Sequence, residues 1–300
     1  MMNMIRRKVI LKSIVMIAIA VVLLSAAPVK ADPFEDATIT VIQGDTAITI
    51  TQGGSLTAPD YNWWYGCSPT SAGMMMGYYD NNGYDNLVPG GTAELSNYGN
   101  PSAIANDTIA SAGHIADFWG ADDPVSHDLD CLADYMYTSR AKADGATSFT
   151  FWLSGNPYTE AQSLLGEGMY GVGQYLEYAG YDVATLYNQL IPYIADDLGP
   201  YPTNTIRFDF DDYMAEIDAG RPVMIQVSGH SMFGYGYGEN STVYLYDTWT
   251  PGPHTMTWGG SYSGLMHYGV MVLTPVPVPA AVLLGILGLS VVGIKLRKFA

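Results

Sequence analysis

Basic residues are scarce in this 300-residue chain, which has 12 lysines and arginines against 29 aspartates and glutamates. Eight of the basic residues lie near the two ends, so residues 32–275 retain only four: Arg140, Lys142, Arg207 and Arg221. All 29 acidic residues lie between Asp32 and Asp247, which gives this middle part a net charge of −25. Such a surface repels phosphate backbones and argues against nucleic-acid binding. It favours cationic partners and metal ions.

Cysteine and histidine are also rare. Cys67 and Cys131 permit one disulfide at most, which excludes a disulfide framework. The histidines number five: His114, His127, His230, His254 and His267. The first two, with Asp117, Asp128 and Asp130, suggest either a metal site or a solvated acidic face. Because their spacing matches no ligand motif, we favour the acidic face and expect no metal and no cofactor.

The segment Asp80–Asp85 contains the aspartate, asparagine and glycine residues typical of a calcium-binding loop. Its glycine is misplaced for an EF-hand, and the final glutamate is missing. A calcium site of another kind stays an alternative interpretation.

The first 31 residues have the three parts of a secretory signal peptide. Basic residues begin the segment, the apolar stretch Ser13–Leu24 follows, and Val29-Lys30-Ala31 is a small-x-small cleavage site. A dozen apolar residues are few for a membrane span. We therefore expect a cleaved signal and export through the secretory pathway, with an N-terminal anchor as the alternative.

The C-terminal residues have a second three-part pattern. Val276-Pro-Val-Pro-Ala-Ala281 precedes an apolar run to Ile294, and a basic cluster follows at Lys295, Arg297 and Lys298. The pattern resembles the PEP-CTERM sorting signals of Gram-negative bacteria in their Val-Pro-x-Pro-Ala form. The resemblance implies membrane anchoring by this tail, then sorting by an exosortase-type enzyme to the cell surface or extracellular matrix. The alternative is a plain C-terminal anchor.

The middle of the chain has the pattern of an α+β domain. β-branched residues alternate on both sides of Gly44-Asp45, which predicts a hairpin in an N-terminal extension, 32–57. The helices expected in the main domain, 58–274, are 67–80, much of 101–140, 159–180 and 211–219. The strands expected there are 147–153, 205–210, 222–228, 243–246 and 270–273. Residues 275–279 then form a linker to the tail.

Cys67 stands where a predicted helix begins. Ser68 or Cys67 itself is suited to cap this helix, and Pro69 suits its first turn. Unpaired N–H groups and the helix dipole favour an anion there, which predicts a lowered thiol pKa and a reactive thiolate. The same N–H groups would bind an oxyanion. The alternatives are a buried structural thiol or a disulfide with Cys131.

A nucleophilic thiolate needs a base, and His230 is the best candidate. It ends the apolar strand that begins at Val223, and Asp247 ends the next strand. If the two strands pair as a hairpin across a connection from Met232 to Thr242, Asp247 lies beside His230 and orients it. His254 and His267, in glycine-rich segments, are alternative bases.

These segments resemble papain-like cysteine peptidases, above all the bacteriocin-leader-peptidase type (family thirty-nine) and its secreted C39-like relatives. The matching residues are Trp64-Tyr-Gly-Cys-Ser-Pro-Thr-Ser-Ala-Gly-Met74, Gly77-Tyr-Tyr-Asp80, Ala219-Gly-Arg-Pro-Val-Met-Ile-Gln-Val-Ser-Gly-His230, Gly236-Tyr237 and Tyr246-Asp-Thr-Trp249. The resemblance implies a papain-like fold in which a helical part carries Cys67 as nucleophile. It implies that an antiparallel sheet carries His230 as base and Asp247 as orienting residue.

One position departs from the family pattern. Papain-like enzymes usually have a glutamine six residues before the cysteine to complete the oxyanion hole, and here that residue is Tyr61. Asn62 is adjacent and has an amide donor, so we take it as the oxyanion candidate beside the Cys67 N–H.

The sequence therefore predicts an exported cysteine hydrolase, a peptidase acting on a peptide or protein through a thioester. One alternative is a non-catalytic binding module held in the extracellular matrix. The other is a different thiol acyl-transfer enzyme, such as a transglutaminase or amidase.

Overall fold

The computed structural model describes residues 38–43, 46–51, 54–90, 94–118, 127–140, 144–151, 166–192 and 208–277. All of them belong to one unit, Phe34–Pro277. The predicted signal peptide and the apolar and basic parts of the predicted tail lie outside the described residues. Within the described ranges, no helix has the length and apolarity needed to cross a bilayer.

The N-terminal extension forms the predicted hairpin. Strands β1 (Thr38–Gln43) and β2 (Thr46–Thr51) pair antiparallel, with Gln43 opposite Thr46. The two strands flank residues 44–45, as the alternation of β-branched residues on both sides of this pair predicts.

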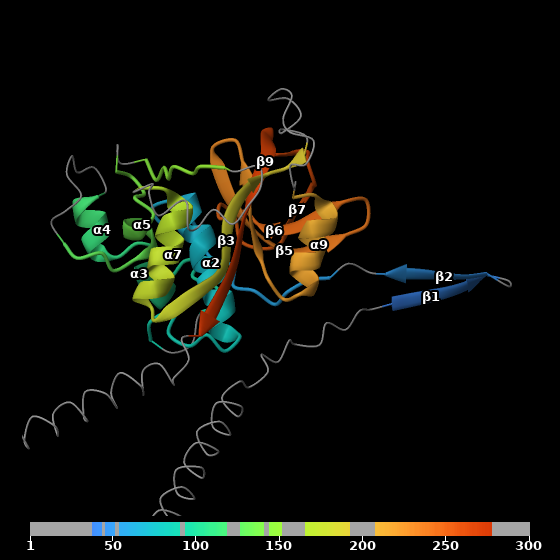
Figure 1. Cartoon of the computed structure of the whole chain (residues 1–300), viewed down its shortest axis with the longest axis horizontal. Coiled ribbons are helices and arrows are strands. Elements are labelled where there is room, and N and C mark those ends of the chain that lie inside the picture. The colour runs from blue at the N-terminus through green and yellow to red at the C-terminus, as the bar shows by residue number, and fades with distance from the viewer. Residues whose placement is uncertain are drawn as a thin grey trace, which may run out of the picture. The chain divides into compact units, whose positions relative to one another are not determined.

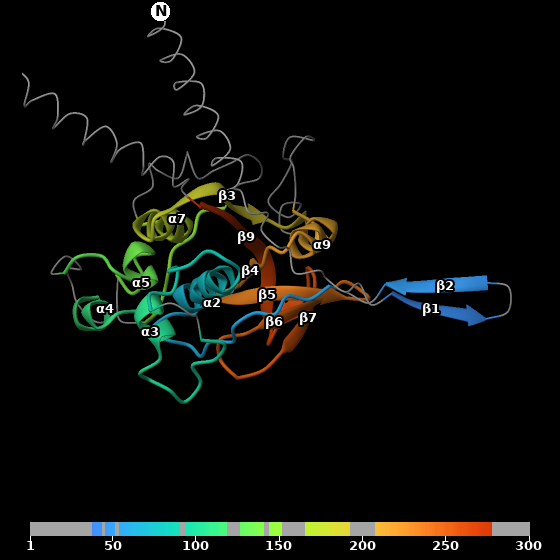
Figure 2. The ribbon, with the colours of Figure 1, turned by 90° about the horizontal axis from the view of Figure 1, so that it is seen from below.

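A seven-stranded antiparallel sheet forms one side of the main domain, with most of the helices on the other (Figures 1 and 2). Its strand order is β3-β9-β4-β5-β6-β7, and β8 pairs with β9. The C-terminal strand β9 therefore lies inside the sheet, between β3 and β4. The strand bounds are β3 Tyr181–Leu190, β4 Val223–Val227, β5 His230–Gly238, β6 Thr242–Tyr246, β7 His254–Thr257, β8 Ser261–Tyr262 and β9 Leu265–Pro277.

Helix α2 (Cys67–Asn81) lies between the sheet and a group of short helices (Figures 1 and 2). It packs on β4 and β5 and, on another side, on α3 and α5. Every residue from Ser68 to Asp80 is buried, so α2 is a core helix with no solvent face. The remaining helices are α3 Ile104–Ile109, α4 Ala112–Asp117, α5 Leu132–Tyr135, α7 Gly168–Tyr178 and α9 Phe210–Asp218.

This mixture of helices and antiparallel sheet confirms the α+β class, and several predicted elements are corrected. Residues 147–151 form no strand, because Thr150 donates its N–H to the Glu167 carboxylate instead of to a neighbouring strand. No strand exists at 208–210 either, because Asp209 caps α9 through a reciprocal capping box with Asp212. Residues 275–277, expected in a linker, pair with β3 as the end of β9.

Candidate active site

The start of α2 is shaped by Gly66, which precedes Cys67. Gly66 has φ of 156°, and a Cβ there would lie 2.8–2.9 Å from atoms of Pro69 and Thr138. The Thr70 hydroxyl donates to the Gly66 carbonyl at 2.6 Å and accepts the Trp64 N–H at 3.0 Å. The prediction that Ser68 or Cys67 caps this helix is wrong, since no side chain caps it. The Ser68 side chain is instead turned toward the sheet.

Ser68 connects the start of α2 to the start of β5. Its hydroxyl oxygen lies 2.8 Å from that of Ser231, and Ser231 donates to Oε1 of Gln226 at 2.8 Å. Because that amide oxygen only accepts and Ser231 has one proton, Ser68 must donate to Ser231. All three side chains are buried. We call this chain the serine relay (Ser68, Ser231 and Gln226).

The sulfur of Cys67 lies beside this relay. Its Sγ is 4.0 Å from the Ser68 hydroxyl, which in turn lies 2.8 Å from the Ser231 hydroxyl. The thiol therefore lies at the first residues of β5, where His230 immediately precedes Ser231. The side chain of Cys67 is partly exposed, whereas that of Cys131 is buried, and both are free thiols.

His230 is buried and held in one tautomer. Its Nε2 lies 2.7 Å from the main-chain carbonyl oxygen of Asp247, and the ring of Trp249 stacks on the imidazole at 3.7 Å between centroids. A carbonyl oxygen only accepts, so Nε2 carries the proton. The free lone pair is then on Nδ1, which is the basic nitrogen of this side chain.

Asp247 contacts His230 through its main-chain carbonyl oxygen, and its carboxylate contacts other residues. The carboxylate accepts the N–H groups of Trp249 and Thr250, both at 2.9 Å, and the Tyr262 hydroxyl at 2.7 Å. Burial raises the pKa of Asp247, but the hydrogen bonds from Thr250, Tyr262 and Trp249 outweigh it and bring the pKa below the usual value. The carboxylate thus fixes the 247–250 turn, whose carbonyl orients the imidazole.

The two strands that bring these residues together are not the predicted pair. β4 turns directly into β5 at Ser228-Gly229, and β5 pairs with β6, placing Phe233 opposite Tyr246. The segment expected as a loop from Met232 is therefore strand up to Gly238. Its glycines resemble a loop sequence, but a Cβ at Gly236 would lie 2.8 Å from the carbonyl oxygen of Gly54. This close approach requires glycine inside the strand.

Tyr61 is fully buried and points along α2, away from the helix start. A Cβ at Gly77 would lie 2.5 Å from the Tyr61 hydroxyl oxygen. Gly77 lies about 15 Å from Cys67 along the helix, at 1.5 Å per residue. The adjacent Asn62 donates its backbone N–H to Oδ1 of Asn97 at 2.6 Å.

The electrostatics of the two principal groups differ from the sequence prediction. Burial raises the pKa of the Cys67 thiol, and the Ser231 N–H only partly offsets it. The expected lowering is therefore wrong, because loss of solvent outweighs the donors at the helix start. Burial also lowers the pKa of His230, against the hydrogen bond and charge of Asp247. Near neutral pH the resting side chains are a thiol and a neutral imidazole.

The two alternative bases have other partners. His267 is buried, donates from Nε2 to the Gly269 carbonyl at 3.2 Å and accepts the Gly259 N–H at Nδ1. Both of its nitrogens are occupied. His254 lies at the Thr250 hydroxyl, 2.9 Å away, with Nε2 3.6 Å from the Asp247 carboxylate.

Sequence reasoning missed the serine relay and the stacked Trp249. Gln226 is the one polar residue of β4, whose five residues are all buried. Its position in this apolar strand is the sequence signal that could have indicated a buried hydrogen-bond network. A glutamine in such a strand requires a buried partner.

Residues 55–261 match the family model described as the Peptidase_C39 like family. No curated protein and no solved structure matches the chain.

Proposed function

Because the chain belongs to the Peptidase_C39 like family, we propose that it is an exported, papain-like cysteine peptidase that cleaves a peptide bond through a thioester on Cys67. The family suggests a cysteine peptidase-type function. The observation that carries the specific proposal is the Ser68–Ser231 hydrogen bond, which holds the start of α2, with the Cys67 sulfur 4.0 Å from the Ser68 hydroxyl, against the residue that follows His230.

The proposed reaction begins with a neutral pair. Nδ1 of His230 removes the thiol proton as the Cys67 sulfur attacks the substrate carbonyl carbon. The protonated imidazole then gives this proton to the leaving amine, which leaves the acyl group on sulfur as a thioester. In the second half, His230 removes a proton from water as its oxygen attacks the thioester, and the proton returns to sulfur as the acid departs. The Asp247 carbonyl keeps Nε2 protonated throughout.

The oxyanion in this proposal is bound at the start of α2. The Cys67 N–H is one donor there, and Pro69 has none because proline lacks an N–H. The amide of Asn62 is the proposed second donor. Tyr61 takes no part, because its hydroxyl is about 15 Å along the helix.

Export and sorting are part of the same proposal. The basic, apolar and small-residue parts of residues 1–31 support a cleaved signal peptide. The Pro motif, apolar run and basic end of the last residues support an exosortase-type partner and transient membrane anchoring. Fractionation of cells that express the full chain tests this, with Pro277 and Pro279 replaced by alanine as the matched control. Retention of both chains in the cytoplasm contradicts it.

The test of the catalytic proposal compares the two thiols within one protein. The purified full chain is alkylated with iodoacetamide across a pH series, and the Cys67 and Cys131 peptides are quantified by mass spectrometry. We expect Cys67 to react faster than the buried Cys131, with an apparent pKa above the ordinary thiol value of about 8.5. In His230→Ala we expect the Cys67 rate to change and the Cys131 rate to stay the same.

Hydrolysis is then measured on a peptide library with an added labelled amine. We expect cleavage by the native chain and by Cys131→Ala, and none by Cys67→Ala. Cleavage that survives Cys67→Ala contradicts the proposal. Transfer of the acyl group to the amine identifies an acyl-transfer enzyme. A folded chain that binds peptides without cleaving them identifies a binding module, the function that the buried Tyr61 would favour.

A further inference from the structure

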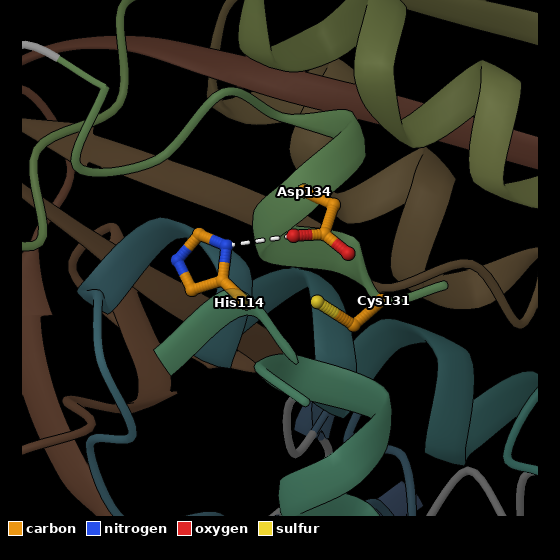
Figure 3. A group of neighbouring side chains, drawn as sticks. All are labelled: His114, Cys131 and Asp134. Atoms are coloured by element: carbon orange, nitrogen blue, oxygen red, sulfur yellow. Dashed lines mark hydrogen bonds and ion pairs between the residues drawn. The ribbon is translucent and has the colours of Figure 1, made fainter. Parts of the chain in front are cut away.

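A second group of reactive side chains lies around Asp134, in the helical part of the unit. The Asp134 carboxylate is fully buried. Its Oδ1 lies 2.8 Å from Nδ1 of His114, and its Oδ2 lies 3.2 Å from Nε2 of His127. The backbone N–H of Asp130 donates to the same Oδ2 at 3.0 Å. Figure 3 shows that His114 and Asp134 come from different helices and that the thiol of Cys131 lies beside them.

His127 is oriented as metal-binding histidines usually are. Its Nδ1 lies 2.7 Å from a carboxylate oxygen of Asp117, while Nε2 faces Asp134. A hydrogen bond from the distal ring nitrogen to a carboxylate fixes the imidazole and makes the other nitrogen a better ligand. The 3.2 Å separation of Nε2 and Oδ2 is also close to the edge between two ligands about 2.0–2.1 Å from a tetrahedral ion.

Asp130 adds a third ligand atom on the solvent side. One carboxylate oxygen of Asp130 and one of Asp134 lie with a His127 nitrogen, all within 4.8 Å of one another. Two carboxylates therefore approach each other although like charges repel, and a shared cation would remove that repulsion. Asp130 is exposed, so the group is open to an ion from solution.

Positive charge is in short supply around these carboxylates. His114 contacts Asp134 through Nδ1, and its buried Nε2 has no hydrogen-bond partner among the described residues. Within the described ranges both arginines are engaged elsewhere, Arg140 over the Tyr137 ring and Arg221 with Glu216. Among the described residues, the imidazoles of His114 and His127 are the cationic partners that Asp117 and Asp134 have.

We propose that His127, Asp130 and Asp134 bind one divalent metal ion of the Zn²⁺ type, with Asp117 and His114 orienting two of the ligands. One imidazole and two carboxylates suit Zn²⁺ and neighbouring first-row ions better than Ca²⁺ or Mg²⁺, which prefer an all-oxygen shell. Water fills the remaining positions. The ion connects the chain at His127 to α5, and none of its ligands belongs to the proposed catalytic site.

The buried set His114, Cys131 and Asp134 also has its ligand atoms within 4.8 Å of one another. It is the weaker set, because all three of its residues are buried, whereas Asp130 opens the proposed set to solvent. Burial raises the pKa of that thiol well above its usual value. The second ring nitrogen of His114 lies on the far side of the ring from Asp134 and Cys131 (Figure 3).

The experiment uses the full chain with Cys67→Ser, so that the proposed catalytic thiol binds no metal. The protein is treated with a chelator, dialysed and titrated with Zn²⁺ by calorimetry, with Ca²⁺ and Mg²⁺ in parallel. We expect one Zn²⁺ per chain and much weaker binding of the other two ions. Asp117→Asn is expected to weaken Zn²⁺ binding about 10–100-fold, and His127→Gln and Asp134→Asn more than that. The exposed neighbour Asp128→Asn is the matched control and binds as the parent does.

Co²⁺ distinguishes the two ligand sets. The proposed set gives a cobalt spectrum without a sulfur-to-metal charge-transfer band, and Cys131→Ser leaves Zn²⁺ affinity unchanged. A charge-transfer band that disappears in Cys131→Ser overturns the proposal in favour of the buried set. Absence of saturable Zn²⁺ binding, or binding unchanged in His127→Gln, overturns it as well. Because His127 and Asp117 are partly exposed, their variants decide the question even if Asp134→Asn does not fold.

Discussion

The imidazole of His230 is held by the main-chain carbonyl of Asp247, at 2.7 Å, while the carboxylate of Asp247 braces the turn that presents this carbonyl. A main-chain acceptor fixes the tautomer as firmly as a carboxylate does, but it carries no full negative charge. The arrangement therefore separates two roles that one aspartate side chain performs in a Ser-His-Asp triad. Orientation comes from the backbone, and the charge acts on the ring from farther away.

Asp247→Asn distinguishes these roles. In a triad whose carboxylate bonds the histidine, this change costs about 10⁴-fold in kcat. Here the carbonyl remains, so we expect a loss of less than about 100-fold in kcat/KM. We also expect the acidic limb of the pH profile to move to lower pH, because the Asp247 charge raises the pKa of His230. Steady-state hydrolysis from pH 4 to 9 measures both, and a 10⁴-fold loss contradicts the carbonyl assignment.

Ser231→Ala tests the serine relay. Without this hydroxyl, Ser68 loses its acceptor and Gln226 loses its donor, which costs about 1–3 kcal/mol in the free energy of unfolding. The Ser68 proton is then free to turn toward the Cys67 sulfur and stabilise its thiolate. We expect faster alkylation of Cys67 at pH 7, measured by mass spectrometry. The exposed Ser228→Ala is the control, and equal rates in the two variants would exclude a role for the relay.

Tyr61→Phe tests the position at which the family usually has glutamine. The Tyr61 hydroxyl is buried without a hydrogen-bond partner among the described residues. Its removal is expected to raise the free energy of unfolding by about 1 kcal/mol and to leave hydrolysis unchanged. Tyr79→Phe is the matched control, because the Tyr79 hydroxyl donates to the Leu273 carbonyl at 2.7 Å, and its loss should destabilise. A large loss of activity in Tyr61→Phe would indicate that the Tyr61 hydroxyl binds the oxyanion and would contradict its exclusion.

Acid stability is expected to depend on His267. Burial lowers the pKa of this histidine to about 4, from its ordinary value of 6.5. Between pH 6.5 and 4, His267 is protonated in the unfolded chain but neutral in the folded chain. The free energy of unfolding therefore falls as the pH falls. The loss reaches about 3 kcal/mol near pH 4, at 1.36 kcal/mol per pH unit. Urea unfolding at both pH values measures it. In His267→Gln this part of the pH dependence should disappear, and an unchanged dependence rules the histidine out.

The parts of the fold with strong local signals could be predicted from the sequence. Helix α2 is indicated by Pro69 near its start and by Asn81-Asn82-Gly83 at its end, and the apolar run from Val223 indicates β4. β5 could not be predicted, because its glycines are required by a neighbouring segment that is distant in sequence. Propensity describes a residue's own preferences and is overridden by such contacts.

Some features of the candidate site could also be predicted from the sequence, and others could not. Cys67 and His230 are recognisable from the motifs around them, and the Asp247 position follows from its strand end. The atom of Asp247 that contacts His230 is a carbonyl oxygen, which every residue has, so no sequence pattern identifies it. The raised pKa of Cys67 likewise depends on burial by parts of the chain far from residue 67.

Because β9 lies between β3 and β4, the last of the described strands to be synthesised is an interior strand of the sheet. A growing chain contains Cys67, His230 and Asp247 before it contains Leu265–Pro277, the strand on which β4 rests. The Ser68–Ser231 bond spans 163 positions, so the thiol and the imidazole stay apart until distant segments have docked. In the proposed function, this order delays assembly of the candidate site until the distant strands of the sheet have been synthesised.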